Sequence, residues 1–134
     1  MNPEIMTPVY REAIVNRDKF TEDNSIFLLE TLEALFPSEK FPEETKINFI
    51  CAACASDERP DLVRYLLDAG FPAHKDAFNY ALIEYNFKNM DLLLEYGLEI
   101  PMADVTHFYN RAQEIDEIDL QDWFAANFPQ YIHE

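Results

Sequence analysis

Glycine is nearly absent from this chain of 134 residues, which contains 2 Gly against 8 Pro. The primed turns of β-hairpins depend on residues that tolerate positive φ, above all glycine. The composition therefore disfavours a hairpin-rich all-β fold. Cysteine is equally scarce, and two cysteines cannot hold together a small secreted scaffold that depends on several disulfides.

Basic residues are also few: 10 Lys and Arg face 26 Asp and Glu, which gives a formal net charge of −16. A domain this acidic repels both the phosphate backbone and anionic lipid surfaces, so we expect no nucleic-acid and no membrane partner. The longest uncharged run, residues 123–133, is too short to span a bilayer. The first 20 residues hold no uncharged stretch that could form the apolar core of a signal peptide, so we expect a cytoplasmic protein.

Hydrophobic residues, in contrast, are abundant. They make up 49% of the chain and aromatic residues 14%, which predicts a packed core rather than a disordered acidic segment. Apolar residues recur at helical spacing in 28–35, 62–67, 90–94 and 120–124, and a second apolar segment precedes each stripe, at 9–15, 47–55, 77–85 and 105–115. No segment sustains the alternation of a strand. The sequence predicts an all-α fold.

The ends of these helices resemble one another. Gly70, Gly97 and Asn127 each follow an apolar helix and precede a large apolar residue, whereas Leu35 stands there in the first copy. That position suits a helix-terminating residue with φ > 0. At the other ends, Asp76, Asp104, Asp119 and less clearly Thr45 are expected N-caps. We predict a single domain over 1–134, a short solenoid of about four stacked helix pairs at 7–37, 45–72, 76–100 and 104–129.

Residues 61–70, with the sequence DLVRYLLDAG, resemble the second helix of an ankyrin repeat, and residues 91–97 repeat the pattern. Ala52 and Ala53 match the small pair of that family's first helix. The segments 71–75 and 98–103 are too short for a full ankyrin hairpin, and no Thr-Pro-Leu-His opening is present, so the likeness is to a degenerate form. The resemblance implies protein binding by a concave face.

Catalytic and metal-binding patterns are few. Cys51 and Cys54 are spaced to share a metal or to act as a redox pair, but no second Cys pair completes a zinc site, so we interpret them as core residues. Asp104, His107 and acids of the 114–122 run give an alternative, a small metal-dependent enzyme. No phosphate loop or nucleophile motif is present, and we expect a non-enzymatic protein without cofactor or metal.

The acidic residues are unevenly distributed. Residues 46–75 hold 4 basic and 4 acidic residues, whereas residues 76–134 hold 2 basic and 12 acidic ones, net −10. Tyrosines lie beside carboxylates there, a composition suited to recognising a basic partner. The alternative is that the negative charge serves solubility alone. The predicted partner-binding residues are Asp57, Glu58, Tyr80, Glu84, Tyr85, Glu114, Asp116 and Glu117.

These features favour a protein-binding module, an inhibitor or immunity-type protein that neutralises a basic partner such as a toxin. One alternative is a regulator that mimics nucleic acid through an ordered stripe of carboxylates. A structural, oligomer-forming role is another, and it would be favoured by an exposed apolar patch at residues 123–132.

Overall fold

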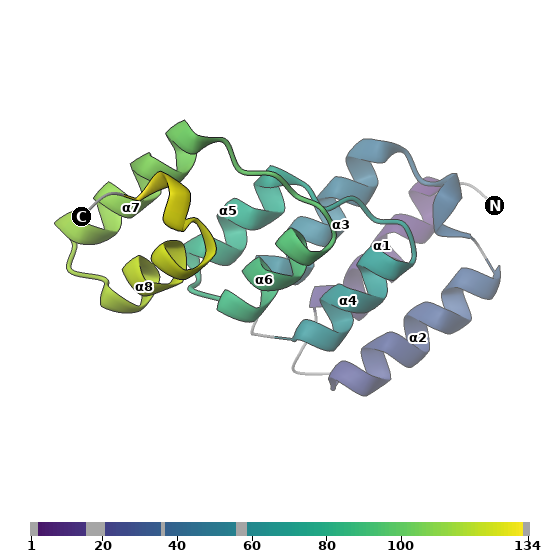
Figure 1. Ribbon diagram of the computed structural model, residues 1–134. Coiled ribbons are helices and arrows are strands. Elements are labelled where there is room, and N and C mark those ends of the chain that lie inside the picture. Colours follow the sequence, from purple (N-terminus) through teal and green to yellow (C-terminus); the bar gives the residue numbers. More distant parts are fainter. Residues whose placement is uncertain (1–2, 16–20, 36, 56–58, 133–134) are drawn as a thin grey trace. The chain divides into compact units, whose positions relative to one another are not determined.

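The structure, a computed structural model, describes residues 3–15, 21–35, 37–55 and 59–132. These segments contain α-helices and short 3₁₀ turns and no strand (Figure 1), which confirms the prediction of an all-α fold. The helices are α1 (Pro3–Val15), α2 (Glu22–Leu35), α3 (Glu43–Ala55), α4 (Pro60–Asp68), α5 (Lys75–Ile83), α6 (Phe87–Glu95), α7 (Met102–Glu114) and α8 (Ile118–Asn127). The 3₁₀ turns are η1 (Ser38–Lys40) and η2 (Pro129–Tyr131).

The chain divides into two compact units, residues 1–98 and residues 99–134. In the first unit, consecutive helices pack in pairs, α1 with α2, α3 with α4 and α5 with α6. The first helices of the pairs also pack side by side, in the order α1, α3, α5, and so do the second helices α2, α4 and α6 (Figure 1). This unit is therefore built from two layers of three helices.

The core of the first unit consists of apolar side chains from both layers. Ile14 and Ile50 from the first helices and Leu29, Leu62 and Leu93 from the second helices are fully buried. Each such side chain contributes about 1.5–3 kcal/mol through removal from water.

An aromatic cluster lies near one edge of this core. The Tyr10 ring meets Phe41 edge-on, with centroids 4.9 Å apart, and stacks against Phe49 at 6.0 Å. The Tyr10 hydroxyl donates to a Glu33 carboxylate oxygen at 3.3 Å. Burial and the neighbouring carboxylate raise the pKa of Tyr10. The cluster thus ties α1 to α2, η1 and α3.

Two predicted helix ends are confirmed. Gly70 and Gly97 both adopt φ of 98°. After α4, Phe71 N–H donates to the Leu66 carbonyl at 3.0 Å and Gly70 N–H to that of Leu67 at 3.1 Å. The same pair of bonds closes α6, so both ends are Schellman motifs.

The prediction for Asn127 is wrong. Among the described non-glycine residues, positive φ occurs at Tyr85 and Asp116, not at Asn127. Asn127 is instead the last residue of α8, where its side-chain amide donates to the Trp123 carbonyl at 2.9 Å. The helix therefore ends without the left-handed turn that closes α4 and α6.

The first helices α5 and α7 end in the same motif without glycine. Tyr85 has φ of 56° and Asp116 has φ of 59°. At the first of these turns, Asn86 N–H donates to the Ala81 carbonyl at 2.9 Å and Tyr85 N–H to that of Leu82 at 3.1 Å, and the turn at Asp116 repeats this pattern. The glycine that the sequence lacks between paired helices is thus replaced by residues held in a strained conformation.

The predicted N-caps are wrong by two or more residues. Asp76, Asp104 and Asp119 lie within the first turns of α5, α7 and α8, and Thr45 is the third residue of α3. The helices begin earlier than expected. The N-cap residue of α5 is His74, whose Nδ1 accepts the Asp76 N–H at 3.0 Å. Carboxylates in a first turn are stabilised by the positive end of the helix dipole, which explains why the residue type was right and the position was not.

Side chains from one pair of helices cap the preceding pair. Arg59, the N-cap residue of α4, donates through its guanidinium to the carbonyl of Ile14 near the end of α1. Asn86, the N-cap residue of α6, donates to the carbonyl of Cys54 near the end of α3 at 3.0 Å. Equivalent positions therefore make equivalent bonds in successive pairs, which fixes the register between them.

In the second unit, α7 packs against α8 and both contact η2. Gln121 donates to the Ala112 carbonyl at 3.2 Å. Trp123, Phe124 and Phe128 are buried and contact one another, with ring centroids 5.1–6.2 Å apart. The apolar stretch at residues 123–132 thus supplies core side chains, and these three do not form the exposed patch that an oligomer-forming role would need.

Candidate partner-binding site

The predicted partner-binding residues of the first unit lie at the end of α5. Tyr80 is 50% exposed, Glu84 is the C-cap of α5, and Tyr85 follows in the left-handed conformation. Ile83 lies among them and is 65% exposed. The turn between α5 and α6 therefore presents large apolar side chains beside a carboxylate. Asp57 and Glu58 lie outside the described residues.

The predicted residues of the second unit occupy the corresponding turn between α7 and α8. Glu114 ends α7 and forms an exposed ion pair with Arg111 at 3.1 Å. Asp116 and Glu117 follow, with Glu117 as the N-cap residue of α8. This turn also exposes Ile115 and Ile118, the latter by 59%. Each unit thus brings its own candidate residues together at one turn.

Exposed aliphatic residues were the part of these turns that sequence reasoning missed. The sequence analysis placed Ile83 and Ile115 in apolar helix segments and Ile118 in none, although all three are exposed. A signal for the first of them was available. Ile83 follows Asp76 and Tyr80 at the i, i+4, i+7 spacing of one helix face, and a face that begins with a charged residue is seldom a core face.

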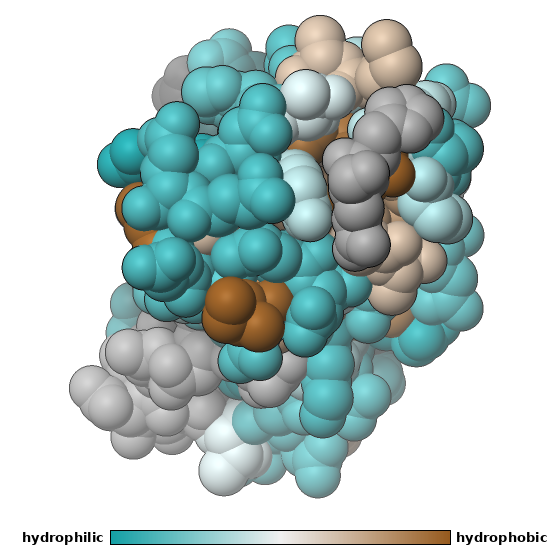
Figure 2. All heavy atoms as spheres, turned by 60° about the vertical axis from the view of Figure 1, so that its left-hand side comes forward, coloured by the Kyte–Doolittle hydropathy of each residue, from teal (hydrophilic) through white to brown (hydrophobic). Residues whose placement is uncertain are grey.

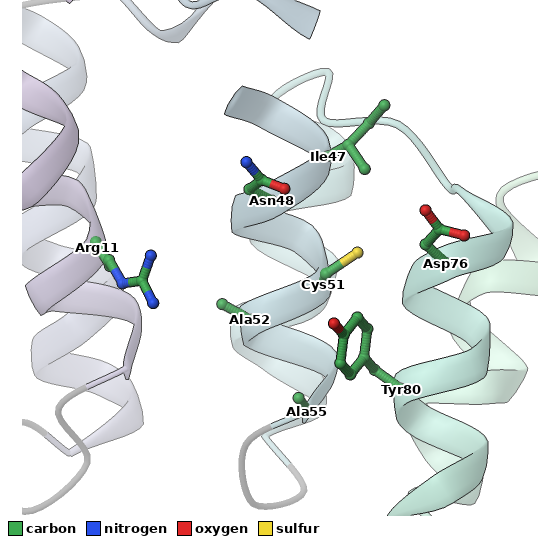
Figure 3. Close-up of a pocket in the computed structure, with 8 residues that line it drawn as sticks. All are labelled: Arg11, Ile47, Asn48, Cys51, Ala52, Ala55, Asp76 and Tyr80. Atoms are coloured by element: carbon green, nitrogen blue, oxygen red, sulfur yellow. The ribbon is translucent and has the colours of Figure 1, made fainter. Parts of the chain in front are cut away.

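A pocket of about 360 Å³ lies on the first unit where α1, α3 and α5 lie side by side. Figure 3 shows that Arg11 reaches toward α3 from one side and that Asp76 and Tyr80 face α3 from the other. The lining residues are Arg11, Ile47, Asn48, Cys51, Ala52, Ala55, Asp76 and Tyr80. Sequence reasoning could not find this pocket, because it joins three helices that are distant in the chain.

The two cysteines are buried free thiols on α3, as the sequence interpretation expected. Burial first, and the Asp76 carboxylate second, raise the pKa of Cys51 to about 11. Burial and the neighbouring Cys51 raise the pKa of Cys54 to about 12. Both groups are therefore neutral thiols at physiological pH, which does not favour metal binding or thiol exchange.

The charge of Asp76 is not neutralised by the histidine next to it. His74 Nδ1 lies 3.7 Å from a carboxylate oxygen of Asp76. The same nitrogen accepts the Asp76 N–H, so it carries a lone pair rather than a proton. The two side chains consequently do not form an ion pair through this contact. Asp76 keeps its negative charge at the edge of the pocket, with its side chain 55% exposed.

A second, shallower pocket of about 240 Å³ lies on the other layer, over α4 and α6. Its Arg64 is already engaged by the Glu95 carboxylate at 3.1 Å and by the Tyr96 ring, whose centroid is 5.9 Å from the guanidinium carbon. The Tyr96 hydroxyl donates in turn to Asp68. The polar groups on this side satisfy one another, so we do not assign a site here.

Asp104 and His107 are exposed on α7, and no group of three His, Cys, Asp or Glu side chains that could hold a metal is found among the described residues. None of the described helices has the length and apolar character needed to cross a bilayer.

Comparison with known proteins gives no relative: neither a protein-family model, nor a curated protein, nor a solved structure matches the chain.

Proposed function

We propose that this protein is a non-enzymatic, ankyrin-like binding module of the cytoplasm whose helix pairs form a short solenoid. Its partner is a protein with a basic surface. By binding it, the chain acts as an inhibitor or immunity-type protein, for instance against a basic toxin.

The composition of the two turns carries this proposal. The turns after α5 and α7 both expose large apolar side chains among carboxylates, as Tyr80, Ile83 and Glu84 do in the first unit. Exposed apolar residues of this size contribute contact area when a partner covers them, and neighbouring charges decide which partner approaches. The face shown in Figure 2 is mainly hydrophilic, with scattered hydrophobic groups.

The charge of the chain supports a basic partner. Residues 99–134 contain eight acidic residues and one basic residue. Such a surface accelerates encounter with a basic protein, by about 10- to 1,000-fold at low ionic strength.

Affinity capture with charge-reversed variants tests the proposal. We expect wild-type protein to retain a basic protein from its source cells, and the double variant Glu84→Lys with Glu117→Lys to lose it. The matched control is Glu30→Lys with Glu39→Lys, which makes the same change in net charge at exposed positions that belong to neither turn.

Binding kinetics with the captured protein then give the decisive measurement. The association rate constant should fall at least about tenfold for the turn variant, much less for the control, and steeply with added salt for wild-type protein. Equal losses for both variants, or an association rate insensitive to salt, would refute a partner site at the turns.

A further inference from the structure

We propose that the pocket between α1, α3 and α5 receives one arginine side chain of the basic partner, with its guanidinium between the Asp76 carboxylate and the Tyr80 ring. The inference rests on the proposed function for the identity of its occupant. It goes beyond that function because it assigns a particular side chain to a particular cavity.

The shape of the pocket suits a long, thin side chain. On α3 the pocket is lined by Ile47 and Asn48 and then by three small residues, Cys51, Ala52 and Ala55, while helices packed on either side of α3 form the flanks. Small side chains leave a channel along α3, in which the methylene stem of an arginine can pack against apolar atoms. Figure 3 shows Tyr80 and Asp76 facing this channel from α5.

The electrostatics of the pocket favour a cation near α5. His74 Nδ1 accepts the Asp76 N–H, so through this contact the histidine places no proton and no positive charge beside the Asp76 carboxylate. The pKa of Cys51 is raised to about 11, mainly by burial and secondly by the Asp76 carboxylate. The negative potential of Asp76 therefore extends to Cys51. The field that opposes a thiolate at Cys51 stabilises a cation in the same place.

Tyr80 selects arginine over lysine. It follows Asp76 by four residues, so both side chains lie on one face of α5. A guanidinium can stack on the tyrosine ring while its N–H groups meet the carboxylate, whereas an ammonium is a more strongly hydrated point charge that cannot stack. Tyr80 is half exposed and its ring is therefore accessible to such a partner group.

Arg11 limits the pocket to one cation. It comes from α1, on the far side of α3 from Asp76. Two successive helix packings separate α1 from α5 by roughly 16–20 Å between axes. A guanidinium at Asp76 is therefore repelled by Arg11 less than a cation bound next to Arg11 would be, because the repulsion falls with distance and with screening by ions. The half of the pocket next to Arg11 repels a second basic side chain.

The test uses a defined probe and the full chain. Acetyl-Gly-Arg-Gly-amide is titrated into ¹⁵N-labelled protein, and the uncharged citrulline peptide serves as its isosteric control. We expect a weak interaction, with saturable shifts of the backbone amides of Cys51, Ala52, Ala55 and Tyr80, and no saturable shifts there with the citrulline peptide.

Substitutions locate the interaction. Asp76→Asn should weaken peptide binding at least fivefold, whereas Asp61→Asn should change it less than twofold. The control is matched because Asp61 and Asp76 are both the second residue of a nine-residue helix and both exposed, but only Asp76 lines the pocket. Tyr80→Leu should weaken binding about threefold, Tyr80→Phe should restore it, and Arg11→Gln should strengthen it slightly.

The outcomes separate the pocket from the proposed function. Equal binding of the citrulline peptide, or equal losses for Asp61→Asn and Asp76→Asn, would overturn the pocket assignment even if a basic protein is captured at the turns. Weaker peptide binding after Arg11→Gln would overturn it as well, because a cationic side chain held at Asp76 should gain affinity, not lose it, when a neighbouring positive charge is removed. Peptide binding as expected, with no basic protein captured, would keep the pocket and reject the proposed function.

Discussion

Among the described residues, four adopt a left-handed backbone at the end of a helix, and two of them are glycines. Gly70 and Gly97 adopt the conformation freely, and a Cβ added to either would meet no atom within 4 Å. Tyr85 and Asp116 hold nearly the same hydrogen bonds with a side chain present. An L-residue with a Cβ is disfavoured there by roughly 1–2 kcal/mol, less for Asp than for Tyr.

Exchanging the two residue types should therefore shift stability in opposite directions. Gly70→Ala should lower the free energy of unfolding by about 1 kcal/mol through backbone strain alone, because the added methyl group has room. Tyr85→Gly should raise it by about 0.5–1 kcal/mol. Urea unfolding followed by circular dichroism measures both. A destabilised Tyr85→Gly would show that contacts of the Tyr85 ring outweigh the strain.

The buried thiols predict a loss of stability at alkaline pH. An unfolded thiol titrates near pH 8.5, whereas the folded pKa of Cys54 is about 12, so between these values only the unfolded state releases the proton. This stability is complete below about pH 8 and decreases by about 1.4 kcal/mol per pH unit above about 8.5.

Cys54→Ala isolates this contribution. Its unfolding free energy should be lower than that of wild type near pH 7, because a buried sulfur is removed, but should fall less between about pH 8 and pH 10. Urea unfolding in the presence of a reductant at both pH values gives the comparison. Parallel pH dependence of the two proteins would mean that Cys54 ionises equally easily in both states.

At the level of the helices, the bonds that link successive pairs are made by side chains at helix starts. Asn86 and Asn89 of the α6 region both point their amides at the Cys54 carbonyl, but at different distances, 3.0 Å and 3.5 Å. The Asn89 Oδ1 is buried and finds no hydrogen-bond partner among the described residues. Asn86 thus makes the stronger hydrogen bond to the Cys54 carbonyl, and Asn89 the weaker one.

Replacing Asn86 and Asn89 by leucine, one at a time, should show how much each side chain contributes to the free energy of unfolding. Asn86→Leu leaves the Cys54 carbonyl without its good donor and should cost about 1–3 kcal/mol of unfolding free energy. Asn89→Leu removes a buried acceptor that has no partner, together with a poor bond, and should cost under about 1 kcal/mol or stabilise the protein. Thermal or urea unfolding of both variants gives the ranking. Equal losses would show that Asn89 has a partner that the structure does not reveal.

The helices were predictable from the sequence because their signals are local. Apolar spacing located the segments, and Gly70 and Gly97 marked two ends. The left-handed Tyr85 was not predictable, since nothing in a tyrosine favours that conformation. Nor were the bonds from Arg59 and Asn86, because each joins residues more than 30 positions apart.

The candidate site also has a part that the sequence predicts and a part that it does not. That Tyr80 and Glu84 lie near each other was predictable, because they are four residues apart on one helical segment. The pocket did not, because it depends on the packing of α1 and α5 on either side of α3, which aligns Arg11 and Asp76 across Cys51. The apolar neighbours of Cys51 in the sequence predict a core residue, but its place beside a cavity depends on helices that are distant in the chain.

For the whole molecule, the net charge of −16 is an energetic cost as well as a means of recognition. Carboxylates that repel one another favour the expanded unfolded state, in which they are farther apart. The repulsion is greatest in residues 99–134, where one arginine, paired with Glu114, faces eight acidic residues.

Added salt should therefore stabilise the protein. Raising NaCl from about 20 to about 500 mM shortens the Debye length from about 20 to about 4 Å, and we expect an increase in unfolding free energy of about 1–2 kcal/mol. The variant Glu99→Gln with Asp122→Asn removes two exposed carboxylates from the densest region, so it should be more stable than wild type at low salt and should gain less from added NaCl. Because any general salting-out effect acts on both proteins alike, only the difference between their salt responses measures the repulsion. Identical salt responses would mean that repulsion between these carboxylates does not destabilise the folded state. The charge of this region could then serve partner recognition without a cost in stability.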